Sequence, residues 1–246
     1  MARNIRYARG SRKKRPEGAW SAGCACDILS AFENHGDYPL HRDLTLNGAP
    51  NPRRRAAPLS RNFYDHPATL VAREMLGMRL VRMRDEVRLS GLIVETEAYL
   101  GEEDLGCHAK AGRTARTSIL YGPPGHAYVY FTYGMHWLLN AVTGPSGFPA
   151  AVLIRAIHPV EGIERMASRR AGRGYDGPAK LTQAMEIGRA ENGLDLTRKA
   201  SRIWIEPGLR IEDRRVTTGP RVGLDNVPEP WKSKPWRFLA QSRLKP

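Results

Sequence analysis

Two carboxylates and an aromatic ring lie close together in the segment Ile93-Val94-Glu95-Thr96-Glu97-Ala98-Tyr99. The segment is rich in β-formers and predicts a strand, in which alternation places Glu95, Glu97 and Tyr99 on one face. A carboxylate at the end of a buried strand can take a proton from water or stabilise a developing positive charge. A solvent-facing strand edge with ordinary charges is the alternative, and the segment alone does not decide between them.

A second segment, Gly125–Met135, concentrates aromatic residues. As a strand it places Tyr128 and Tyr130 on one face, and a turn at Gly134-Met135 leaves Tyr133 at the tip of a hairpin. A ring on a protruding hairpin can enter a base stack and hold the gap that a flipped nucleotide leaves. The alternative is a set of core aromatics with one exposed ring at a turn.

The charge balance favours a polyanionic partner. The chain has 39 Lys and Arg against 25 Asp and Glu, a formal net charge of +14 at pH 7. Neutralising phosphates releases condensed counterions, so such a surface suits nucleic acid. Charge alone leaves a generic basic protein equally open.

The cysteines and histidines give no pattern for a metal or a disulfide framework. Cys24, Cys26 and Cys107 lack the second pair and the histidine spacing of a zinc site, and no two of the seven histidines form an H-x-x-x-H pair. No apolar run approaches the ~18 residues of a membrane helix. We therefore expect a cytoplasmic protein without metal or cofactor, not bound to a membrane, and associated with the nucleoid if the source is bacterial.

Composition divides the chain near residue 58. Residues 1–58 contain basic clusters at 12–15 and 53–55 with almost no apolar periodicity. Such a segment buries too little apolar area to offset the entropy of ordering, so we expect a disordered basic extension before a domain over residues 59–246. This extension is an arm that adds nonspecific DNA affinity, an inert tail, or a stretch included because an upstream start codon was chosen in error.

Periodicity in residues 59–246 predicts an α+β fold: a single mixed domain with a curved, mainly antiparallel sheet flanked by helices and a protruding β-hairpin. Asp65 as N-cap and Pro67 in the first turn predict one helix start, and Gly77 its C-terminal position. Further helices are expected over 159–170 and 178–187. Strands are expected over 79–83, 91–99, 127–133, 137–142, 150–157, 203–206, 222–223 and 236–239.

Several motifs in this order resemble the alkyladenine (3-methyladenine) DNA glycosylase family, in its mammalian type. They are Glu95-Thr96-Glu97-Ala98-Tyr99 with Gly101, Glu103-Asp104 and His108; Gly125-x-x-Tyr128-Val129-Tyr130-x-x-Tyr133-Gly134-Met135 with Asn140; Leu153-Ile154-Arg155-Ala156; and Gly177-Pro178-Ala179-Lys180-Leu181. The resemblance runs from about Leu59 to Leu239. Glu102 and residues 105–107 match more loosely, and the first 58 residues have no counterpart.

The resemblance implies a monofunctional glycosylase of base excision repair. Such an enzyme flips alkylated or deaminated purines, of the 3-methyladenine type, out of double-stranded DNA and hydrolyses the N-glycosidic bond with an activated water. It implies no cofactor, and we expect a monomer. Cys107, which lies beside His108, puts the substrate range in doubt.

The resemblance also implies a role for individual residues. Glu97 would be the general base, with Arg155 and the main chain at Val222 helping to hold the water. Four residues would line the base-binding pocket: Tyr99, His108, Tyr130 and Asn140. Tyr133 would be the intercalating wedge.

Four basic residues are candidates for phosphate contacts: Arg113, Arg116, Lys180 and Arg221. Solvated surface charge is the alternative for each of them.

Three other functions compete with this interpretation. A glycosylase that also cuts the strand needs an amine nucleophile, and Lys180 is the only lysine within a motif. A non-enzymatic binding module would use the charge and the aromatics for stacking alone. A degenerate relative would bind lesions without turnover.

Overall fold

The computed structural model describes residues 56–171 and 174–241 of the 246-residue chain. Apart from residues 56–58, the predicted basic extension and its arginine clusters lie outside the described residues. The backbone N–H of Leu59 donates to the Ile205 carbonyl at 2.8 Å, so the ordered fold includes Leu59.

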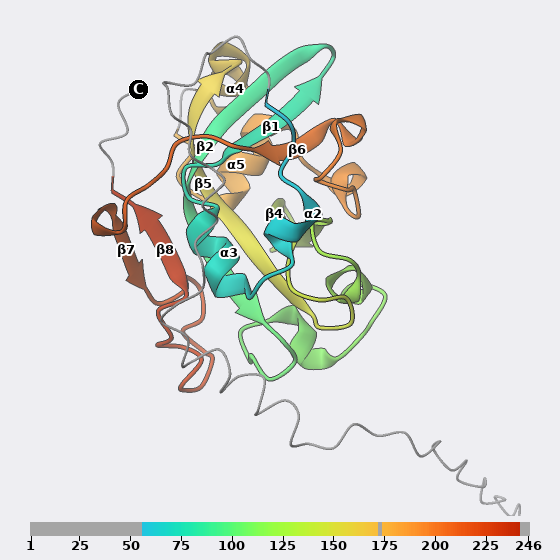
Figure 1. The fold of residues 1–246 in the computed structure, drawn as a ribbon, viewed down its shortest axis with the longest axis vertical. Helices are drawn as coiled ribbons and strands as arrows, with labels where there is room; N and C mark the ends of the chain where they lie inside the picture. The colour runs from blue at the N-terminus through green and yellow to red at the C-terminus, as the bar shows by residue number, and fades with distance from the viewer. Residues whose placement is uncertain (1–55, 172–173, 242–246) are drawn as a thin grey trace, which may run out of the picture. The chain divides into compact units, whose positions relative to one another are not determined.

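Within the described ranges, eight strands form one open antiparallel sheet in the order β3-β4-β5-β2-β1-β6, with β8 beside β2 and β7 beside β8 (Figure 1). The strands are β1 (Arg79–Arg84), β2 (Val87–Leu100), β3 (Ala127–Thr132), β4 (His136–Val142), β5 (Ala150–Glu161), β6 (Ile203–Glu206), β7 (Val216–Gly219) and β8 (Arg237–Ala240). The α-helices are α2 (Arg61–Tyr64), α3 (Ala68–Glu74), α4 (Ile163–Arg170) and α5 (Pro178–Met185). The predicted α+β class is confirmed.

Strand β2 is the centre of the sheet and carries Glu97, the expected general base. Its first half pairs with β1, its second half pairs with β8, and β5 runs along the opposite edge. Strands β1 and β2 form a hairpin with a turn at Asp85-Glu86, and β2 begins at Val87, earlier than the predicted residue 91. Both turn residues have positive φ, 47° and 59°, which matches the twist of a tight hairpin.

Two predicted boundaries around helices are wrong. Residues 159–161 continue β5, because they pair with β2, and α4 begins only after Gly162, whose φ is +69°. Asp65 does not cap a helix start: it follows the end of α2, and Pro67 stands at the N-cap of α3.

The last third of the chain contains two further differences. Val222–Gly223, predicted as a short strand, is a turn. Strand β7, which was not predicted, pairs with β8, and β8 joins it to β2 within the same sheet (Figure 1).

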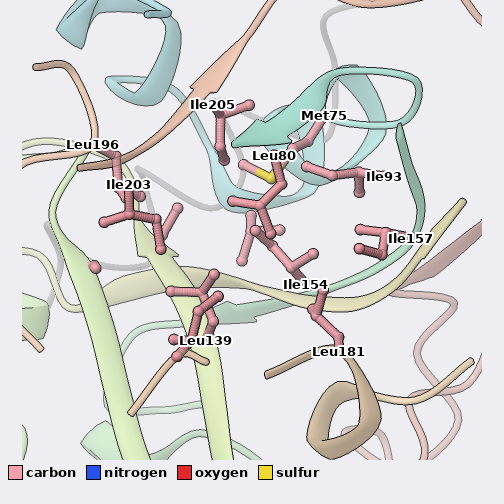
Figure 2. Packing of buried hydrophobic residues seen from close by; sticks show 14 of the residues in the cluster. Met75, Leu80, Ile93, Leu139, Ile154, Ile157, Leu181, Leu196, Ile203 and Ile205 are labelled. Carbon is pink, nitrogen blue, oxygen red and sulfur yellow. The ribbon is translucent and has the colours of Figure 1, made fainter. Parts of the chain in front are cut away.

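The hydrophobic core lies on one face of the sheet and is closed by α3 and α5. Met75, Leu80, Ile93, Ile154 and Leu181 meet there (Figure 2). Each buried side chain of this size contributes about 1.5–3 kcal/mol.

Alternation along β5 separates the core from a pocket. Val152 and Ile154 belong to the core, whereas Leu153 and Arg155 line a cavity on the other face. Packing of one face of β5 in the core therefore fixes the strand whose other face lines the cavity.

Candidate active site

The cavity has a volume of about 340 Å³, within the usual range of small-ligand sites. Seven of the residues singled out from the sequence line it: Tyr99, His108, Tyr130, Tyr133, Asn140, Arg155 and Val222. They come from β2, η1 (His108–Ala111), the β3–β4 hairpin, β5 and the turn after β7. The fold thus gathers side chains from five separate segments at one pocket.

Glu97 is fully buried, and three groups that line the pocket hold its carboxylate. The Val222 backbone N–H donates to Oε1 at 2.7 Å, and the Tyr99 hydroxyl donates to Oε2 at 2.8 Å. The Arg155 guanidinium lies 3.3 Å from Oε1. Hydrogen bonds to the charged form favour a carboxylate.

Opposing effects act on the acidity of Glu97. Burial raises its pKa above the ordinary value of 4.5, while Arg155, the Val222 N–H and the Tyr99 hydroxyl lower it, and the net direction is upward. A buried carboxylate with a raised pKa and defined partners is a better proton acceptor than one exposed to solvent.

Arg155 links the two acids that the sequence places on one strand face. Its Nε donates to Glu95 Oε1 at 2.9 Å, and Arg237 approaches the same oxygen at 3.2 Å. Thr96, between the two acids, instead donates from its hydroxyl to the Ala72 carbonyl in α3. The predicted convergence of Glu95, Glu97 and Tyr99 is therefore present.

His108 and two tyrosines form an aromatic wall of the pocket. The His108 ring lies edge-on to Tyr130, with centroids 4.4 Å apart, and its Nδ1 is 3.0 Å from the Tyr128 hydroxyl. Burial, aided by Arg116 and Lys110, lowers the pKa of His108 to about 4. The imidazole is therefore neutral at pH 7.

Asn140 is held rigidly where it faces the cavity. It is buried, and its side-chain Nδ2 donates to the Tyr128 carbonyl at 3.0 Å across the β3–β4 pair. One amide group therefore has a fixed orientation at the pocket wall.

The described residues offer no cluster of three or more His, Cys, Asp or Glu side chains able to hold a metal. In the same ranges no helix is both long and apolar enough to cross a membrane.

Residues 62–243 match the family described as Methylpurine-DNA glycosylase (MPG). The chain belongs to the methylpurine-DNA glycosylase family. A relative from Methanocella arvoryzae is 47% identical over 185 residues, covering 73% of this chain and 90% of its own. One from Myxococcus xanthus is 44% identical over 180 residues, covering 73% and 88%. One from Clostridium acetobutylicum is 45% identical over 193 residues, covering 73% and 92%. All three are named "Putative 3-methyladenine DNA glycosylase".

The protein is therefore a DNA glycosylase, a hydrolase that acts on DNA. Glu97 is buried beside this pocket, and tyrosine and histidine rings form part of the pocket wall.

In this glycosylase the predicted hairpin carries an exposed aromatic tip. Tyr133 is 83% exposed and Met135 is 68% exposed, while Phe131 packs on Trp137 at 4.8 Å nearer the sheet. Tyr133 has a φ of 50° and Gly134 a φ of 66°, which makes the turn tight. Tyr133 is also one of the residues that line the pocket.

Three of the four candidate phosphate contacts lie where solvent reaches them. Arg113 and Arg116 are exposed beside aromatic rings, 5.6 Å from the centroid of Tyr121 and 5.4 Å from that of Tyr130. Lys180 is 44% exposed at the start of α5 and pairs with Asp176 at 3.1 Å.

Arg221 does not fit the role of a phosphate contact. Its side chain is fully buried, and both of its terminal nitrogens donate to Asp104. A guanidinium enclosed in this way is not available to DNA. The sequence gives Arg221 no local sign of burial, because its partner lies 117 residues away; Glu103-Asp104 belonged to a recognised motif but had no assigned role.

Proposed function

We propose that this glycosylase flips alkylated or deaminated purines out of double-stranded DNA and hydrolyses their N-glycosidic bond directly with water, without cutting the strand. The observation that carries the proposal is the buried Glu97 carboxylate, which is held by three groups that line the cavity: Val222, Tyr99 and Arg155.

Glu97 acts as the general base in this proposal. As the bond between the sugar C1′ and the purine nitrogen breaks, its electron pair leaves with the base and positive charge develops on the sugar. The carboxylate stabilises that charge and takes a proton from the water whose oxygen attacks C1′. Arg155 and the main chain at Val222 orient the carboxylate and the water.

The aromatic walls recognise the flipped base. Tyr99 and Tyr130 stack on it, and electron-poor alkylated purines gain most from such contacts. Neutral His108 hydrogen-bonds near the sugar and base. Asn140, fixed by its bond to the Tyr128 carbonyl, disfavours an additional exocyclic amine, as on guanine.

Base release from defined duplexes tests this function. We propose that the protein acts as a monomer. The full chain is incubated with duplexes that carry one 3-methyladenine-type, ethenoadenine or hypoxanthine base. We expect abasic sites, no strand break before alkali treatment, and no covalent adduct after borohydride reduction. An adduct would establish Schiff-base chemistry instead, and tight duplex binding without release of any base would establish a lesion-binding protein.

Lys180→Ala is expected to weaken duplex binding about equally for every lesion, because Lys180 would contact a phosphate and carry no sequence information. The slope of log K against log salt concentration should fall by about 1. Binding titrations at several salt concentrations measure this effect.

Asp176→Asn is the matched control for Lys180. It removes the carboxylate that competes for the lysine, so binding should tighten slightly. A changed lesion preference in Lys180→Ala, with an unchanged salt slope, would contradict the assignment.

A further inference from the structure

An ion pair with no exposed surface lies directly behind the Glu97 site. The side chains of Arg221 and Asp104 are both 0% exposed, and Arg221 Nη2 donates to Asp104 Oδ1 at 2.8 Å. Arg221 also donates to the Ala98 carbonyl in β2 at 3.0 Å and to the Trp231 carbonyl at 3.2 Å. One guanidinium therefore ties together β2, the loop that follows it and the C-terminal segment.

Two aromatic rings enclose the same guanidinium. The Arg221 Cζ lies 4.7 Å from the Tyr99 ring centroid and 5.0 Å from that of Trp236. A planar guanidinium can stack between rings and donate hydrogen bonds at its edge at the same time, which an ammonium group cannot do. The arrangement therefore requires arginine specifically, and it fixes the ring whose hydroxyl contacts Glu97.

The loop after β2 is shaped around this pair. Asp104 accepts hydrogen bonds from the backbone N–H groups of Leu100 and Gly106, at 3.2 and 2.9 Å. A Cβ at Gly106 would lie 2.8 Å from Arg221 Nη2, so only glycine lets the loop approach so closely. Asp104 is thus held in place before it binds the guanidinium.

Val222 follows Arg221 directly and depends on it for its position. Its side chain is 47% exposed, and residues 222–223 form a turn outside the strand pairing, so its own packing provides little anchorage. Its backbone N–H is nevertheless aimed at Glu97 Oε1 at 2.7 Å. The buried residue that precedes it supplies the missing constraint.

We propose that Arg221 is a positioning residue for hydrolysis: its buried pair with Asp104 fixes the turn so that the Val222 N–H stays bonded to Glu97. The inference rests on the proposed role of Glu97 as general base. Arg221 touches neither water nor DNA in this account and acts only through its neighbours.

Loss of the Arg221–Asp104 pair is expected to raise the pKa of Glu97. Glu97 faces Arg155 on β5, Tyr99 and Glu95 on β2, and Tyr130 on β3, while Arg237 on β8 reaches it only through Glu95. If the Val222 N–H moves away, the charged form of Glu97 loses a hydrogen bond and its pKa rises. A general base works when deprotonated, so the acid limb of the rate profile moves to higher pH.

The test is the single-turnover excision rate of the full chain against pH for Arg221→Met and Asp104→Asn. Both are expected to shift the acid limb upward by about one pH unit, the size expected for a hydrogen bond to a charged group. Arg82→Met is the control, because the Arg82–Glu191 pair is also a buried ion pair, with both side chains 6% exposed, and neither residue lines the pocket. It should lower thermal stability without moving the limb.

Asp104→Asn separates positioning from a direct charge effect. It leaves an uncompensated cation, which through space would lower the pKa of Glu97 and move the limb to lower pH. A downward shift or an unmoved limb in Asp104→Asn would overturn the proposal, whether or not Arg221→Met folds. Glu97→Gln distinguishes failure of the proposed function from failure of this inference. If Glu97→Gln retains full activity, Glu97 is not the general base. If Glu97→Gln is inactive but the acid limb of Asp104→Asn does not move, only the role of Arg221 is rejected.

Discussion

Glu97→Gln is expected to lower the single-turnover rate of base excision by about 10²–10⁴-fold, the usual contribution of general acid–base catalysis. Glutamine preserves the shape of the side chain but cannot accept the proton from water. Its amide NH₂ must also face one of the donors that now point at the two carboxylate oxygens. Quenched-flow or manual sampling of abasic sites under enzyme excess measures the rate.

Glu95→Gln is the control for this variant. Glu95 lies on the same strand as Glu97 and has the same arginine partner, Arg155. Its cost should be far smaller, since Glu95 only helps to hold Arg155. Duplex affinity should stay close to the parent value in both variants. Equal loss of rate in the two would indicate that the acids act only through the placement of Arg155.

Tyr133→Ala is expected to lower excision from duplex DNA by about 10–100-fold, since stacking of a ring on a base contributes about 1–3 kcal/mol. The exposed ring would fill the space that the flipped nucleotide leaves, and alanine cannot fill it. Single-turnover rates on duplex DNA measure the effect.

Two comparisons show whether the Tyr133 ring acts as a wedge. Tyr133→Phe keeps the ring and should retain nearly the full rate. A single strand with the same lesion has no duplex stack to hold open. On that substrate, the excision rate of Tyr133→Ala should be close to that of the parent protein. An equal loss on single and double strands would instead assign Tyr133 to the pocket wall, which it also lines.

The parts of the site that lie on strands could be predicted from the sequence. Alternation in residues 95–99 places Glu97 and Tyr99 on one face of β2, where their side chains bond to each other, and Thr96 on the opposite face toward α3. The tight turn at Gly134 likewise predicts an exposed Tyr133. In each case a local rule of strand geometry determines where the side chain points.

The turn at Val222 could not be predicted, because its position depends on distant partners. The sequence predicts a short strand at Val222–Gly223, whereas the fold places these residues beyond β7 and bonds the Val222 N–H to Glu97, 125 residues away. Its basic side chain makes Arg221 a candidate phosphate contact from the sequence, because basic residues are usually exposed. Its burial follows from long-range pairing that no local pattern contains.

Helix and strand ends also depended on tertiary pairing. The sequence predicts a helix that begins at residue 159, but β2 is long enough to pair with residues 159–161, and the ladder extends β5 to Glu161. Strand β7 has mostly exposed polar residues and forms because β8 lies beside it. Sheet partners, not intrinsic propensity, decided both cases.

The pH dependence of excision of a neutral lesion tests the central claim most directly. Single-turnover rates on a hypoxanthine duplex are measured for the parent and for Glu97→Gln across the acidic and neutral range. Because burial raises the pKa of Glu97, the parent rate should fall with decreasing pH earlier than for an ordinary carboxylate, and the residual Glu97→Gln rate should lack that limb. An identical acid limb in Glu97→Gln would contradict the assignment of Glu97 as the base.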